Sequence, residues 1–268
     1  GLIIWYQKGL NNPPFELSGL FSNPNYTGMW FNLTLPFVLA YFVRSKKTFF
    51  KKNLIFGLIL IIIFSIILTS SRAAWASIIF SLILIYGRKS FIYLFCFMGI
   101  LTLIILLCIF PLFGESLQLF FQNIIPNNIW MEFSTTNFSD RALRFEIWQK
   151  AIDIIRENPI FGSGAATFPV LTKGQFIHKV YHSHNLPLEI ALNYGLPSLF
   201  LIVGSISLIV FVASKKIFFS NPDRYKKNIF DRAWISALII LMVTQLFDIQ
   251  YFDGRISIAS WIFISGLN

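Results

Sequence analysis

The sequence is poor in charged residues. Asp, Glu, Lys and Arg make up only 13% of its 268 residues, whereas hydrophobic residues make up 56%. In soluble domains about a quarter of the residues are charged and about half are apolar. This composition excludes an ordinary soluble domain, and we expect an integral membrane protein.

Cysteine and several catalytic motifs are also scarce or missing. The two cysteines, Cys96 and Cys108, lie in one apolar run, which argues against a disulfide or thiolate framework. The sequence has no P-loop, Asp-x-Asp, Gly-x-Ser-x-Gly or His-Glu-x-x-His motif. These absences disfavour a transferase that uses a metal and a nucleotide, and we expect neither a metal nor a cofactor.

Long hydrophobic runs are abundant. A helix that crosses the hydrocarbon core needs roughly 17–25 residues, and about seven runs approach that length. They lie near 27–43, 53–69, 73–86, 91–113, 186–213, 233–250 and 256–268. We therefore expect an all-α, polytopic transmembrane bundle. Because the chain begins at Gly1 in what reads as the tail of an apolar segment, we expect the C-terminal part of a longer protein.

The positive charge predicts the topology. The formal net charge is +10, and most Lys and Arg residues fall in three loops, at 44–52, 87–90 and 214–232. Such loops usually face the cytoplasm, so the other loops should face outward. The division is then transmembrane helices at 1–113, an outer loop at 114–185 and transmembrane helices at 186–268. The sequence has no basic stripe interleaved with aromatic residues, so the positive charge does not indicate binding of nucleic acid.

The outer loop is too long to be an idle connection. Within it, residues 140–158 predict an amphipathic helix, because Asp140 can cap it and Pro159 stops it. On a wheel of about 100° per residue, one face carries Phe145, Trp148, Ile152 and Ile155. This helix would suit the membrane surface or a groove over the bundle.

Arginines occupy unexpected places on the outer side. Arg141 and Arg144 lie on the apolar face of the expected helix, where an unpaired charge needs an anion or water. Arg72, in the turn "TSSRAAW", is a third outward arginine. The side chains could reach lipid headgroups, or they could bind the phosphates of a lipid-linked ligand, since guanidinium binds phosphate in bidentate fashion.

All three histidines fall within seven residues, at His178, His182 and His184. Asn185 and Pro187 predict a helix that starts directly after them, and Gly195 with Pro197 predicts an interruption in it. At a helix N-terminus the His184 ring tends to be neutral, as a general base must be. An interfacial histidine without a catalytic task is an alternative.

A zinc site that includes His182, His184 and His178 is a further alternative. Zinc sites usually fix their ligands at helical or Cys-x-x-Cys spacing, with a further carboxylate or thiolate, and neither feature is evident here. We therefore expect no metal here.

Four segments resemble, in the same order, motifs of the O-antigen ligase and polymerase superfamily of bacterial membrane glycosyltransferases. They are "FSNPNYTG" (21–28), "SSRAAW" (70–75), "RFEIWQKAIDIIRENPIFGSGAATF" (144–168), and His184-Asn185 with Gly195. The resemblance implies a GT-C-like helical fold in the bacterial inner membrane, with the active site facing the periplasm. It implies transfer of a glycan from an undecaprenyl diphosphate carrier to a glycolipid or glycan acceptor, without metal and with inversion.

The resemblance also implies roles for individual residues. His184 would activate the acceptor hydroxyl or assist at the leaving phosphate, and Arg72 and Arg144 would hold the diphosphate. Arg141 is added as a third diphosphate-binding residue only because the helix wheel places it on the same face as Arg144. Asn25, Asn185 and His182 are expected to support the site, and Asn-Pro-Asn also suits an ordinary turn.

Two other functions are compatible with this pattern. A transporter of bicarbonate or another small anion would also use a basic outer pocket, but transporters usually carry ionisable groups within their spans. Here the spans contain almost none except Asp248. A non-catalytic assembly protein would leave Arg141 and Arg144 unexplained. We therefore favour a glycosyltransferase with membrane lipids as neighbours and no nucleic-acid partner.

Overall fold

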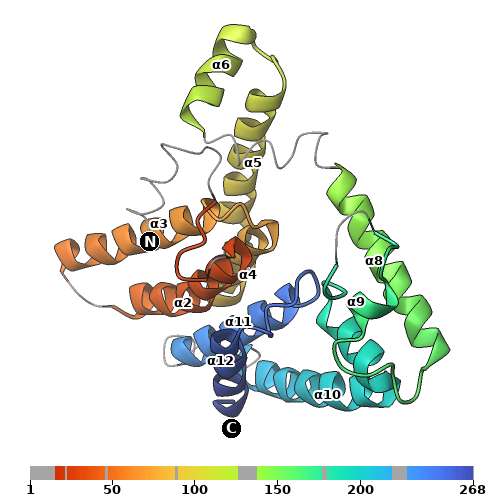
Figure 1. Cartoon of the computed structure of the whole chain (residues 1–268). Helices are drawn as coiled ribbons and strands as arrows, with labels where there is room; N and C mark the ends of the chain where they lie inside the picture. The colour runs from red at the N-terminus through yellow and green to blue at the C-terminus, as the bar shows by residue number, and fades with distance from the viewer. Residues whose placement is uncertain are drawn as a thin grey trace. The chain divides into compact units, whose positions relative to one another are not determined.

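The computed structural model describes residues 16–21, 23–45, 48–87, 90–125, 138–176, 180–218 and 228–267, and all regular structure in these residues is helical (Figure 1). The helices are α2 (Pro24–Arg44), α3 (Phe49–Ile67), α4 (Arg72–Tyr86), α5 (Ser90–Ile109), α6 (Glu115–Ile124), α8 (Phe138–Glu157), α9 (Phe168–Leu171), α10 (Leu186–Phe218), α11 (Ile229–Thr244) and α12 (Gly254–Ser265). The prediction of an all-α fold is confirmed for these residues.

The chain forms two compact units. The first holds α2 to α6 and α11 up to Ile240, and the second holds α8 to α10 together with the chain from Leu241 onward. Each unit has its own packing and is described by itself.

Apolar side chains cover much of the helix surfaces. Among the described residues, α3 and α10 are long and apolar enough to cross a membrane, and α4, α12 and Leu94–Ile109 of α5 are shorter apolar helices. On α3 the exposed large side chains are Phe49, Phe50, Leu54, Phe56, Leu58, Leu60, Ile61 and Phe64. Soluble monomers rarely expose apolar patches of this extent, which agrees with a membrane protein. The number of seven spans and the three-part division stay predictions.

α11 is shorter than the apolar run that predicted it. A span was expected over 233–250, but the helix ends at Thr244 and a turn follows. The carbonyl of Gln245 accepts a hydrogen bond from the amide of Leu186 at 2.9 Å, and its side-chain Oε1 accepts one from the amide of Gln250 at 3.0 Å. These bonds hold the chain in a turn where an apolar helix would otherwise continue.

In the first unit, α2 packs against both α3 and α4 (Figure 1). α2 begins at the Asn-Pro-Asn segment, where Oδ1 of Asn23 accepts a hydrogen bond from the amide of Asn25 at 2.9 Å. A Cβ added to Gly28 would lie 2.7 Å from Cβ of Ala74 and 3.1 Å from Oγ1 of Thr69. The missing side chain at Gly28 therefore allows α2 to approach the start of α4 closely.

In the second unit, α8 confirms the helix predicted over 140–158 but not its buried face. The buried residues are Ile147, Ala151, Ile154 and Ile155, and they pack against Phe168, Ala191 and Leu192. Phe145, by contrast, is 67% exposed. Ile155 is buried and Trp148 packs against this core, as predicted, but the centre of the buried face is turned by about a quarter turn from the predicted one, because α8 packs on the first turns of α10. Arg144 still falls in line with Ala151 and Ile155.

α10 is interrupted at Gly195, as the sequence predicts. Gly195 has non-helical backbone angles (φ 82°, ψ 167°), and the chain after α8 pairs with the interruption. The amides of Ser163 and Gly164 donate to the carbonyls of Leu192 (2.7 Å) and Asn193 (3.1 Å), and the amide of Leu196 donates to the carbonyl of Pro159 (2.7 Å). The interruption thus becomes the docking site for the segment 159–164.

We predict that Gly195→Ala destabilises the protein by at least about 2 kcal/mol, because a Cβ there would collide with the carbonyl oxygen of Ile160 and the positive φ is strained for alanine. The thermal unfolding midpoint of the purified protein in detergent measures this. Gly204→Ala is the matched control, since a Cβ at Gly204 on the same helix meets no atom within 4 Å. Equal midpoints for the two variants would contradict the prediction.

Candidate functional site

Two loops of the second unit meet at the start of α10. Asn185 caps this helix, as predicted, because its Oδ1 accepts a hydrogen bond from the amide of Leu188 at 3.0 Å. Its Nδ2 donates to the carbonyl of Leu246 at 3.0 Å. One side chain therefore fixes the helix start and also ties the loop 180–185 to the turn that follows α11.

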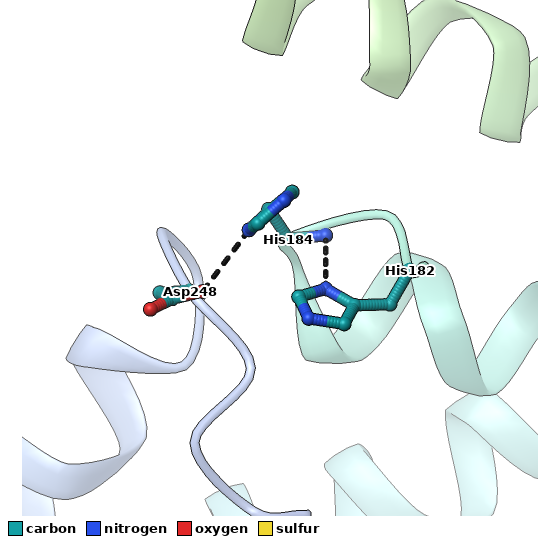
Figure 2. Close-up of side chains that lie close together, drawn as sticks. All are labelled: His182, His184 and Asp248. Atoms are coloured by element: carbon teal, nitrogen blue, oxygen red, sulfur yellow. Dashed lines mark hydrogen bonds and ion pairs between the residues drawn. The ribbon is translucent and has the colours of Figure 1, made fainter. Parts of the chain in front are cut away.

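His184 and Asp248 face each other across this junction (Figure 2). Nδ1 of His184 lies 3.0 Å from Oδ1 of Asp248, and the side chains are 32% and 11% exposed, respectively. No local sequence pattern pairs these residues, which are 64 positions apart. The one feature of the sequence that could have indicated a role for Asp248 is that it is almost the only ionisable residue in the apolar runs. The result is a histidine held by a largely buried carboxylate.

His182 supports the backbone at His184 (Figure 2). Nδ1 of His182 accepts a hydrogen bond from the amide of His184 at 3.3 Å, and the ring centroids are 4.3 Å apart. His184 has φ of 54°, which a non-glycine residue adopts only where its surroundings hold it. Burial and the nearby His184 lower the pKa of His182, so its ring favours the neutral form that can accept this bond.

Glu189 anchors the same loop from inside the helix. Glu189 is only 3% exposed, and its Oε2 accepts a hydrogen bond from the amide of Ser183 at 2.8 Å. Oε1 accepts a longer one from Nδ2 of Asn193 at 3.4 Å. Glu189 lies in the first turn of α10, and its bond to Ser183 fixes the residue directly before His184.

Arg144 contributes to the electrostatics of Asp248. Burial raises the pKa of this carboxyl, but the hydrogen bond from His184 and the charges of His184, His182 and Arg144 together hold it below its usual value. Arg144 is therefore close enough for its charge to act on Asp248. Arg141 lies on the same helix, but the structure does not describe its side chain, and His178 also lies outside the described residues.

The other two predicted residues belong to the first unit. Asn25 lies in the first turn of α2, and Arg72 is the first residue of α4, whose N-cap is Ser71. Close packing at Gly28 and a hydrogen bond from Nδ2 of Asn32 to the carbonyl of Ala74 (3.0 Å) hold these helices together. Two of the four motif segments thus meet in the first unit, and the other two meet in the second.

The His184 cluster also has the composition of a metal site. His182, His184 and Asp248 each offer a ligand atom, and these atoms lie within 4.8 Å of one another. The sequence argued against a metal because neither the usual ligand spacing nor a further carboxylate or thiolate ligand was evident. The fold supplies the carboxylate from the turn after α11, so that part of the argument no longer holds.

Comparison with known proteins gives one family. A family model described as O-antigen ligase matches residues 56–203, more than half of the chain. The matched region includes Arg72, Arg144, His184 and Gly195, whereas Asn25 and Asp248 lie outside it. No curated protein matches the chain significantly.

We predict that Glu189→Ala loosens the His184 loop, because it leaves the buried amide of Ser183 without its acceptor, at a cost of about 1–3 kcal/mol. Hydrogen exchange of the backbone over 180–186 should become faster, and the unfolding midpoint should fall. Glu189→Gln keeps a side-chain oxygen at this place and should recover most of the protection. Wild-type exchange in the alanine variant would show that Glu189 does not anchor the loop.

Proposed function

The chain belongs to the O-antigen ligase family, and from this premise we propose that it transfers a glycan from an undecaprenyl diphosphate carrier to an acceptor hydroxyl. The acceptor would be lipid A-core, in a ligation, or a glycan, in a polymerisation. We place the reaction at the periplasmic face of the inner membrane, because the loops at 44–52, 87–90 and 214–232 carry most of the positive charge and favour the cytoplasm.

The observation that carries this proposal is the hydrogen bond between His184 and Asp248. With the carboxylate accepting the proton on Nδ1, Nε2 of His184 keeps its lone pair and can accept a proton. Asp248 would orient the ring and stabilise the imidazolium that forms. His184 is thus the catalytic residue of the proposal, and Asp248 is a positioning residue.

The reaction then follows in one displacement. The acceptor hydroxyl gives its proton to Nε2 of His184 while its oxygen bonds to the anomeric carbon. The bond from that carbon to the diphosphate breaks, and the carrier diphosphate leaves with the electron pair. Direct attack inverts the anomeric carbon. These steps use only side chains of the protein and need no metal.

The leaving diphosphate needs positive charge where its negative charge develops. We assign this task to Arg144, whose charge acts on Asp248, and to Arg72 and Arg141. Asn185 and His182 would support the site through the bonds that hold the His184 loop. Asn25 would support it through the start of α2.

We predict that His184→Ala lowers the acceptor-dependent release of undecaprenyl diphosphate by about 100-fold or more, the usual contribution of a general base. Asp248→Asn should lower turnover as well, because the amide cannot hold the ring in the reactive tautomer. The assay uses the whole protein in liposomes with a lipid-linked glycan and a lipid acceptor.

Carrier binding should survive in both variants. Asp253→Asn is the matched control, because Asp253 lies in the same turn region but pairs with Arg255 (2.7 Å) and caps α12. Full turnover in His184→Ala would remove His184 from the mechanism. Anion uptake by the same liposomes, without glycan transfer, would contradict the proposed reaction and indicate transport.

We predict that Arg144→Gln weakens carrier binding by about tenfold or more, since charged hydrogen bonds contribute about 1.5–3 kcal/mol. Binding of undecaprenyl diphosphate to the purified protein measures this. Arg156→Gln on the same helix is the control, because Arg156 is exposed and pairs with Asp153 at 3.2 Å. An equal loss in both variants would mean that the effect is general charge attraction.

A further inference from the structure

The cluster around His184 offers more than an acid–base pair. Two imidazole rings and one carboxylate, from His182, His184 and Asp248, place their ligand atoms within 4.8 Å of one another. Such a mixed nitrogen and oxygen set suits Zn²⁺ and similar first-row cations, whereas Mg²⁺ and Ca²⁺ prefer oxygen ligands alone. The chemistry of the donors therefore selects a narrow class of ions.

We propose that His182, His184 and Asp248 bind a divalent transition cation, with Zn²⁺ as its representative, and that the bound ion inhibits glycan transfer. The binding stands on the geometry of the cluster. The inhibition rests on the proposed function, because it requires that His184 act on the acceptor.

The cluster needs only a small contraction to become a zinc site. In a tetrahedral site with bonds of about 2.0–2.2 Å, ligand atoms lie about 3.3 Å apart. Nδ1 of His184 and Oδ1 of Asp248 are already 3.0 Å apart. No two of the ligand atoms lie more than 4.8 Å apart, so the contraction needed is at most about 1.5 Å. Three protein ligands leave a fourth position for water.

Two contacts within the cluster would give way to the ion. The proton shared by His184 and Asp248 would give way to the cation. His182 would give up the amide hydrogen bond from His184, which is long at 3.3 Å. His184 is 32% exposed, so an ion can reach the cluster from solvent. Three metal bonds would offset the loss of these two contacts.

A cation bound in the cluster would inhibit transfer for a simple reason. A cation bound to both His184 and Asp248 separates the base from its positioning carboxylate and takes a lone pair of the ring. The ring can then no longer serve the acceptor hydroxyl in the proposed way. Zinc and glycan transfer are therefore mutually exclusive at this site.

The binding test uses Co²⁺ alone as a probe, since bound four-coordinate Co²⁺ absorbs strongly in the visible region. The whole protein, purified in detergent and freed of metal with a chelator, should bind one Co²⁺ per chain and release it to Zn²⁺. Affinity should fall at least tenfold in His182→Ala and in Asp248→Asn, and it should be unchanged in Asp253→Asn. Equal affinity in all four proteins would overturn the proposal.

The inhibition test uses the liposome assay with added Zn²⁺. Wild-type turnover should fall at zinc concentrations that displace Co²⁺ and return when a chelator is added. The zinc concentration that halves turnover should rise at least tenfold in His182→Ala, relative to that variant's own activity. Full turnover at saturating zinc would overturn the inhibitory role.

The two arms separate the two proposals. Metal binding is measured without any glycan, so a protein that binds Co²⁺ through these residues but transfers no glycan would contradict the proposed function and not the metal site. A protein that transfers glycan but binds no Co²⁺ would contradict the metal site and not the function.

Discussion

The pairing of the segment 159–164 with the interruption in α10 is the constraint on which the second unit depends. An interrupted helix exposes carbonyls that need partners, and the amides of Ser163 and Gly164 supply them. This pairing holds the end of α8 against the first turns of α10, where Ala191 and Leu192 complete the apolar core. The His184 loop leads into these same turns. The backbone of the site therefore continues into a helix that packs against α8 and pairs with the segment 159–164.

Two acidic residues near the start of α10 are used in different ways. Glu189 is buried and accepts hydrogen bonds from an amide of the loop and from Asn193, which makes it part of the scaffold. Asp248 lies nearer to solvent and accepts its bond from a titratable ring. A carboxylate satisfied by backbone fixes a conformation, whereas one paired with imidazole can take part in proton transfer. This difference is the reason to propose that Asp248 positions the reacting histidine, whereas Glu189 has a structural role.

Local signals in the sequence predicted local structure well. The cap at Asn185, the helix over 140–158 and the interruption at Gly195 all followed from residue types and spacing, and the structure confirms them. The failures are tertiary. The wheel for α8 misplaced Phe145, since its buried face is set by what packs against it, and no pattern within 233–250 revealed that the turn after Thr244 would bring Asp248 to His184.

The motif residues divide by the physical task that each performs. Gly28, Gly162 and Gly195 all lie where an added Cβ would meet atoms of a neighbouring segment, so their role is close approach of backbones. Arg144 and His184, together with Asp248 from outside the motifs, contribute charge and hydrogen bonding. The glycines bring distant segments together, and the polar residues then meet at fixed distances. A substitution at a glycine should therefore disturb the site through stability, whereas one at His184 or Arg144 should disturb it through chemistry while the fold remains.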